Sequence, residues 1–202
     1  MTESSKKVSN KSTEEKVEML KNYIKSLTDE TRFKFWIKTL LSSYNTIPEI
    51  IKTIDKIIEL QASSLTFASD IYNQSKSTLS QVEKVIDLTE RKNSLLNIYI
   101  MIKEMIKKLS ETDAEMLEKK FVFNWSSEEL AREYEVSVRT IYRKIDRIIE
   151  QIYEYCIKHK WSLRFIELQV KEEGWLKEKF LKIITEYYKN TNYKFNEILE
   201  KS

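Results

Sequence analysis

A short run of basic side chains is the strongest chemical signal in this sequence. The segment 137–147 contains four basic residues and one acidic residue, so its local net charge is +3. An arginine guanidinium can donate two hydrogen bonds to the O6 and N7 atoms of guanine, and any cation can neutralise a phosphate. The whole chain carries the same formal charge of +3, from 35 basic and 32 acidic residues, so the excess is concentrated rather than spread. The segment could therefore contact nucleic acid, which the bulk composition alone does not indicate.

The basic residues divide by their spacing on a helix. Arg139 and Arg143 are four residues apart and share one face, so we expect them to read bases. Lys144 and Arg147 lie further around the helix, where we expect contacts with phosphates. The full set of candidate DNA-contacting residues is Ser137, Val138, Arg139, Thr140, Tyr142, Arg143, Lys144 and Arg147.

The other members of this set would complete the interface. Tyr142 could touch a thymine methyl group or donate a hydrogen bond to a phosphate. Ser137 or Thr140 could anchor the amino-terminal end of the helix on the nucleic-acid backbone. Val138 is expected to point outward together with Arg139.

Two helices are expected to hold these side chains in place. Ser126 and Glu129 form an S-x-x-E capping box, which predicts a short helix that runs to about Tyr134. Ser137 is a suitable N-cap, so a second helix should follow after a tight turn. Ala131 is small enough for a close helix crossing, with Val136 filling the angle. The buried face of the second helix is predicted to consist of Ile141, Ile145, Ile148, Ile149 and Ile152.

The segment EELAREYEVSVRTIYRKIDRI resembles the helix-turn-helix of sigma-70 region 4, with the family's preceding helix expected at 113–121. It is similar also to phage regulators of the ArpU and RinA type. The residues that fit the family pattern are Glu128, Glu129, Leu130, Ala131, Val136, Ser137, Thr140, Ile141, Arg143 and Ile145. The resemblance implies a helical unit that binds double-stranded DNA.

Two departures from the family pattern limit what this resemblance implies. Glu135 stands where the family usually has glycine, and a non-glycine residue at positive φ costs about 1 kcal/mol, so we expect a slightly different turn. The sequence before Leu109 has no D-D-x-x-Q-E motif for binding polymerase core and no aromatic and basic melting helix. The segment RFKFWIKTL around Trp36 comes nearest to such an aromatic and basic helix, but Trp36 fits a buried apolar stripe. A divergent sigma factor is therefore an alternative interpretation.

Catalytic and metal-binding signals are absent from the sequence. Gly174 is the single glycine, so no P-loop, dinucleotide fingerprint or G-x-S-x-G elbow can exist. Cys156 and His159 are three residues apart, but no third orienting group accompanies them, and we interpret both as structural. With one cysteine and one histidine there is no zinc-site spacing. We expect no enzyme activity, no cofactor and no metal.

Composition predicts an all-α fold. The chain has one glycine and one proline, whereas hairpin-rich β folds need such residues at their turns. Pro48 suits the first turn of a helix whose buried face would include Ile54 and Leu60. The segment 76–109 predicts one long helix, or two broken near 89–93. Its apolar residues favour a core helix over a dimerising coiled coil, whose seam would be interrupted by Thr89, Asn93 and Lys103.

The predicted organisation has four segments. They are a disordered leader (1–12), a helical N-terminal domain for dimerisation or polymerase contact (13–108), a helix-turn-helix DNA-binding domain (109–155) and a helical extension (156–202). We expect the extension to dock onto the DNA-binding unit. The start of the sequence lacks the apolar core of a signal peptide and no segment is apolar enough to span a membrane, which favours the cytoplasm.

Three functions remain open at this level. The favoured one is a sequence-specific transcription regulator that binds double-stranded DNA, with RNA polymerase and a second copy of the chain as further candidate partners. The second is a divergent sigma-like factor. The third is a helical adaptor that binds proteins without contacting DNA.

Overall fold

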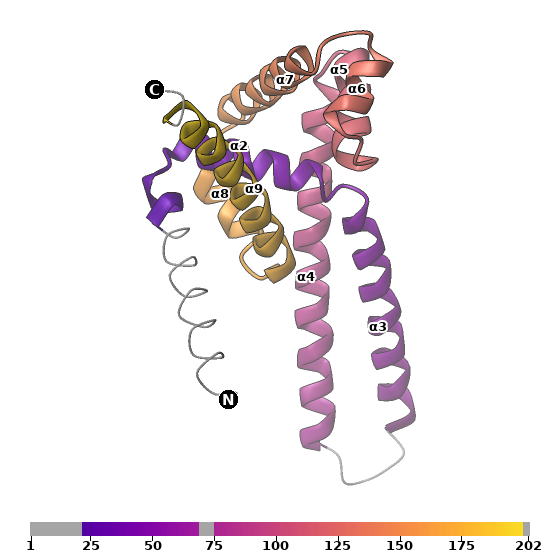
Figure 1. Cartoon of the computed structure of the whole chain (residues 1–202). Helices are drawn as coiled ribbons and strands as arrows, with labels where there is room; N and C mark the ends of the chain where they lie inside the picture. The colour runs from indigo at the N-terminus through magenta and orange to yellow at the C-terminus, as the bar shows by residue number, and fades with distance from the viewer. Residues whose placement is uncertain (1–21, 69–74, 200–202) are drawn as a thin grey trace, which may run out of the picture.

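The computed structural model describes residues 22–68 and 75–199, and every regular element in these ranges is helical, as predicted (Figure 1). The predicted leader at 1–12 lies outside the described residues. In chain order the elements are α2 (Asp29–Leu41), α3 (Thr46–Ala68), α4 (Ser75–Lys107), α5 (Glu111–Leu117), the π-helical turn η1 (Glu118–Val122), α6 (Ser127–Glu133), α7 (Val138–Lys158), α8 (Leu163–Gln169) and α9 (Gly174–Leu199).

The α2 helix lies at the centre of the packing. Thr28 is its N-cap, and its hydroxyl accepts a hydrogen bond from the Thr31 amide at 3.2 Å. Phe33 and Trp36 are buried, and the Trp36 ring stacks on Phe180 of α9 with centroids 4.1 Å apart. Trp36 is therefore a core residue, as its position in an apolar stripe predicted.

The helices α3 and α4 form a long antiparallel hairpin that projects from the rest of the molecule (Figure 1). The segment 89–93 lies within one continuous α4, so the predicted long helix is confirmed and the broken alternative is wrong. Ile54 packs between the two helices with 2% of its surface exposed, but Leu60 is 71% exposed. Leu60 was expected in the buried face and is not there, because it lies to the side of the α3 stripe that meets α4.

The carboxy-terminal helices pack against α2 and α4 rather than mainly on the helix-turn-helix unit, which corrects the expected docking. Trp36 and Phe180 join α2 to α9, while an ion pair joins α4 to the turn before α9. In that pair, the Arg91 guanidinium donates to both carboxylate oxygens of Glu173, at 2.9 and 3.0 Å, and Trp175 Nε1 donates at 2.7 Å.

Buried apolar side chains from α2 through α9 form one hydrophobic cluster. The helix-turn-helix unit therefore shares its core with the helices before and after it, and the predicted division into segments stays a prediction. Across the described residues, no helix combines the length and the apolar character needed to cross a bilayer.

Candidate nucleic-acid interface

The first helix of the predicted unit, α6, begins at a complete capping box. The Ser126 hydroxyl accepts a hydrogen bond from the Glu129 amide at 3.1 Å, and the Glu129 carboxylate accepts one from the Ser126 amide at 2.6 Å. These bonds lower the pKa of Glu129, chiefly through the backbone N–H of Ser126, because they stabilise the charged carboxylate. The predicted capping box is confirmed, and it defines where α6 starts.

A tight turn connects α6 to α7. Glu135 has φ 51°, so it adopts the left-handed conformation that glycine would take without strain. The Val136 amide donates to the Ala131 carbonyl at 3.0 Å, which closes the turn. The Ser137 hydroxyl then accepts from the Thr140 amide at 3.1 Å, so the predicted N-cap of α7 is confirmed.

The inner faces of α6 and α7 are buried as predicted. Leu130 and Ala131 of α6 have exposed fractions of 0% and 8%. The five isoleucines predicted for α7 are all buried, namely Ile141, Ile145, Ile148, Ile149 and Ile152. Because one face of α7 is held by the core, the direction of its outer face is determined.

The outer face of α7 exposes most of the candidate DNA-contacting residues. Exposed side chains are those of Ser137, Arg139, Tyr142, Arg143, Lys144 and Arg147. Thr140 is half-buried. Val138 is half-buried too and packs against the core, which corrects its predicted outward position. Its place in the first turn of α7 lets the side chain reach back over the turn between the helices.

The four cations on this face have no acidic partner within the described part of the chain. None of the salt bridges there includes one of them, whereas neighbouring carboxylates are engaged by other elements. Asp146 lies 3.4 Å from Lys38, and Glu150 lies 2.5 Å from Lys34, both on α2. These two carboxylates of α7 are thus paired with lysines of α2, and the cations remain available to an anionic ligand.

The contribution of Lys34 and Lys38 was not predicted from the sequence. Their four-residue spacing on the α2 stripe places them on one face, but nothing in the sequence says that this face meets α7. On α6, Glu133 is likewise held by Lys119 at 2.8 Å.

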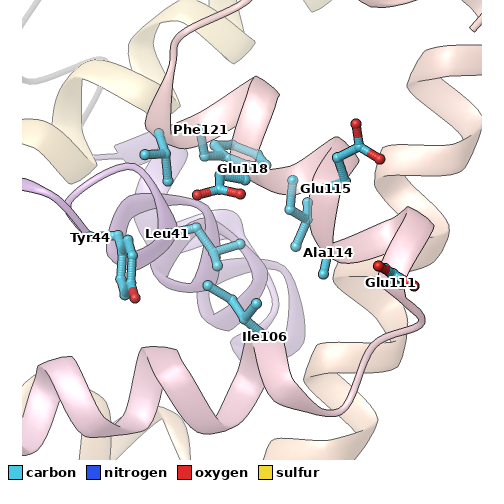
Figure 2. Close-up of a pocket in the computed structure, with 10 residues that line it drawn as sticks. Leu41, Tyr44, Ile106, Glu111, Ala114, Glu115, Glu118 and Phe121 are labelled. Carbon is cyan, nitrogen blue, oxygen red and sulfur yellow. The ribbon is translucent and has the colours of Figure 1, made fainter.

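A cleft of about 360 Å³ lies beside the unit, between the α2–α3 junction, the end of α4, α5 and η1 (Figure 2). Its walls are apolar at Leu41, Ile106 and Phe121, and Glu111 and Glu115 lie along its α5 side. Carboxylates repel phosphates, so this cleft does not belong to an anion-binding surface. The basic face of α7 is the better candidate interface.

Cys156 and His159 do not form a reactive pair. Cys156 is fully buried, and burial raises the pKa of its thiol to about 12. His159 is exposed at the end of α7, where its Nδ1 lies 2.8 Å from the Tyr155 carbonyl. Among the described residues, no three His, Cys, Asp or Glu side chains are grouped to hold a metal ion.

Comparison with known proteins agrees with this geometry. Residues 99–152 match the family model described as sigma-70, region 4. The match begins in the last turns of α4, includes α5, η1 and α6, and ends within α7. No curated protein and no solved structure gives a significant match. The chain therefore carries a helix-turn-helix unit of the sigma-70 region 4 type.

Proposed function

We propose that this protein is a sequence-specific transcription regulator that binds double-stranded DNA in the cytoplasm, with α7 in the major groove. The observation that carries the proposal is that α7 exposes four cations with no acidic partner among the described residues, on a helix whose opposite face is buried. A single α-helix fits the major groove, and a rigidly held helix positions its donors accurately. The proposal includes no catalytic step.

The residues of α7 take different roles in this proposal. Arg139 and Arg143 donate hydrogen bonds to base edges and supply the sequence preference. Lys144 and Arg147 neutralise phosphates and fix the position of the helix along the duplex. Tyr142, which is 57% exposed, adds a contact with a phosphate or a thymine methyl group.

The test is a selection of bound sequences from random duplex DNA, with the Arg139→Ala/Arg143→Ala variant alongside. We expect the intact protein to enrich one motif, and the variant to bind that motif roughly 30-fold to 10,000-fold more weakly. The matched control is Arg164→Ala/Lys182→Ala, which removes the same charge from exposed positions on α8 and α9. Equal losses in both variants would mean that binding depends on overall charge alone.

Salt dependence separates the phosphate contacts from the base contacts. Lys144→Ala should weaken binding to all sequences alike and reduce the salt slope by about one unit. A variant of Lys144 that changes the selected motif would contradict its assigned role.

A sigma-like factor is the second candidate function, and the match to sigma-70 region 4 supports it. In that case the α2–α4 part of the chain contacts RNA polymerase. The same selection, repeated with polymerase core, distinguishes the two: enrichment that needs core favours the sigma-like factor. No enrichment under either condition would favour a helical adaptor that binds proteins only.

A further inference from the structure

The α4 helix carries a stripe of apolar side chains on the side turned away from the core. Leu79, Ile86 and Ile100 are 62%, 52% and 55% exposed, and Val82 also faces solvent. On the opposite side of the helix, Ile98 is buried in the core, with 1% of its surface exposed. An exposed apolar stripe along a projecting helix is a feature of interaction surfaces rather than of monomer surfaces.

The stripe follows a heptad repeat. Its a positions are Leu79, Ile86, Asn93 and Ile100, and its d positions are Val82, Thr89 and Leu96. Three of the four a residues are large and aliphatic, and the fourth is a single asparagine, the feature that sets register and strand number in paired helices. The repeat ends at Lys103, whose ammonium lies 5.0 Å from the centre of the Tyr99 ring.

The pattern is complementary to itself. When two copies of α4 lie side by side in register, each a residue meets the same residue of the other copy. Asn93 then meets a second Asn93, and an amide both donates and accepts hydrogen bonds, so the two can satisfy each other. A partner with an unrelated sequence would have to supply a matching polar group at this one level. The expected occupant is therefore a second copy of this chain.

Charge indicates the orientation of the pair. The e positions of the repeat include Glu83, Glu90 and Glu104. In an antiparallel pair the e rows of the two helices face each other, so like charges would meet, whereas a parallel pair avoids this. The segment from Leu79 to Ile100 is about 33 Å long at 1.5 Å per residue, so a parallel pair keeps both helix-turn-helix units at one end.

We propose that this protein forms a homodimer through a parallel, two-stranded coiled coil along α4. The dimer has twofold symmetry and leaves α3 on the outside of each copy. Two α7 helices at the same end could enter successive major grooves, whose centres are about 34–36 Å apart. This last consequence rests on the proposed DNA binding, whereas the dimer itself does not.

The experiment is sedimentation equilibrium of the full chain without DNA. We expect a dimer for the intact protein, and for Ile86→Asp a dissociation constant raised roughly 100-fold or more, because two charges would enter an apolar seam. The matched control is Leu60→Asp on α3, an exposed leucine outside the repeat, which should change the dissociation constant less than about threefold. Circular dichroism of each variant shows that it is folded.

Cross-linking tests the register. Under mild oxidation, Ile100→Cys should form a disulfide with its own copy, while the intact protein should not, because Cys156 is buried. Cross-linking only when Ile100→Cys is mixed with Val82→Cys would overturn the parallel arrangement. Asn93→Ile should tighten association and admit higher oligomers, since the polar residue that specifies the pair is gone.

A monomer at every concentration, or equal effects of Ile86→Asp and Leu60→Asp, would overturn the dimer. A dimer that selects no DNA motif would instead overturn the proposed function and leave this inference standing. A monomer that selects a DNA motif would overturn the dimer and leave the proposed function standing.

Discussion

Removing the guanidinium of Arg91 should show how strongly the carboxy-terminal helices are held to α4. Glu173 is nearly inaccessible, with 1% of its side chain exposed, and Arg91 provides two of its three hydrogen bonds. The third comes from Trp175 Nε1. The hydrogen bond to Glu173 is also the main reason that the pKa of Arg91 is raised. In Arg91→Met the buried carboxylate would keep one donor and lose its counter-charge.

The expected loss of stability follows from the burial of Arg91 and Glu173. Removing one partner from a fully buried ion pair costs about 3–5 kcal/mol. The Arg91 side chain is 41% exposed, so water already screens part of the interaction, and we expect a loss of about 2–3 kcal/mol. In Arg91→Met/Glu173→Gln the amide oxygen can still accept from Trp175 without a buried charge. The cost should then fall to about 1 kcal/mol.

The assay is urea unfolding followed by far-ultraviolet circular dichroism, for both variants and for a control. The control is Lys107→Met, which removes an exposed partner 4.0 Å from Glu104 and should cost less than about 0.5 kcal/mol. If Arg91→Met cost no more than this control, the buried carboxylate would not depend on Arg91 and the reasoning would be refuted. A double variant less stable than the single one would refute it too.

Four smaller predictions concern the helix-turn-helix unit and the residues next to it. Glu135→Gly should stabilise the protein by about 0.5–1 kcal/mol, because relief of the left-handed strain exceeds the extra chain entropy of glycine. Asn124→Gly, at φ 56°, should stabilise the protein less, because asparagine tolerates this conformation. Urea unfolding measures both changes. The Cys156 thiol, with its pKa raised to about 12 by burial, should react with a thiol reagent in the unfolded protein and not in the native one, and rapid labelling of native protein would contradict its burial. Ser126→Ala should cost about 1 kcal/mol of stability. Because the pKa of Glu129 is lowered in the folded state, its contribution is present above its unfolded pKa and is lost as pH falls through the folded value. The stability difference between the intact protein and Glu129→Gln should therefore shrink below about pH 4, and a difference that does not change with pH would exclude this role.

Local signals in the sequence were sufficient for the helix-turn-helix unit. The capping box at Ser126 and Glu129 and the N-cap at Ser137 are hydrogen bonds between residues three apart, so they form wherever the chain turns helical. The isoleucine period of α7 predicted its buried face for the same reason, since residues three and four apart share a side of a helix. The exposed positions of Arg139 and Arg143 follow directly.

The backbone conformation of Glu135 could not be predicted from neighbouring residues alone. Its position at the turn was evident, and because positive φ is costly for a residue other than glycine, we expected a slightly different turn. The structure shows positive φ, because the buried faces of α6 and α7 and the Val136 to Ala131 hydrogen bond together hold the turn closed.

The sequence by itself determined which stretches are helical and which residues share a helix face, because both depend on contacts between near neighbours. Only the tertiary structure decided what each face meets. It left Leu60 and Leu79 exposed on the hairpin, buried Glu173 against an arginine 82 residues away, and placed Lys38 beside Asp146. These outcomes depend on the packing of whole helices, and an apolar or charged stripe carries the same local pattern whether its partner is the core, another helix or solvent.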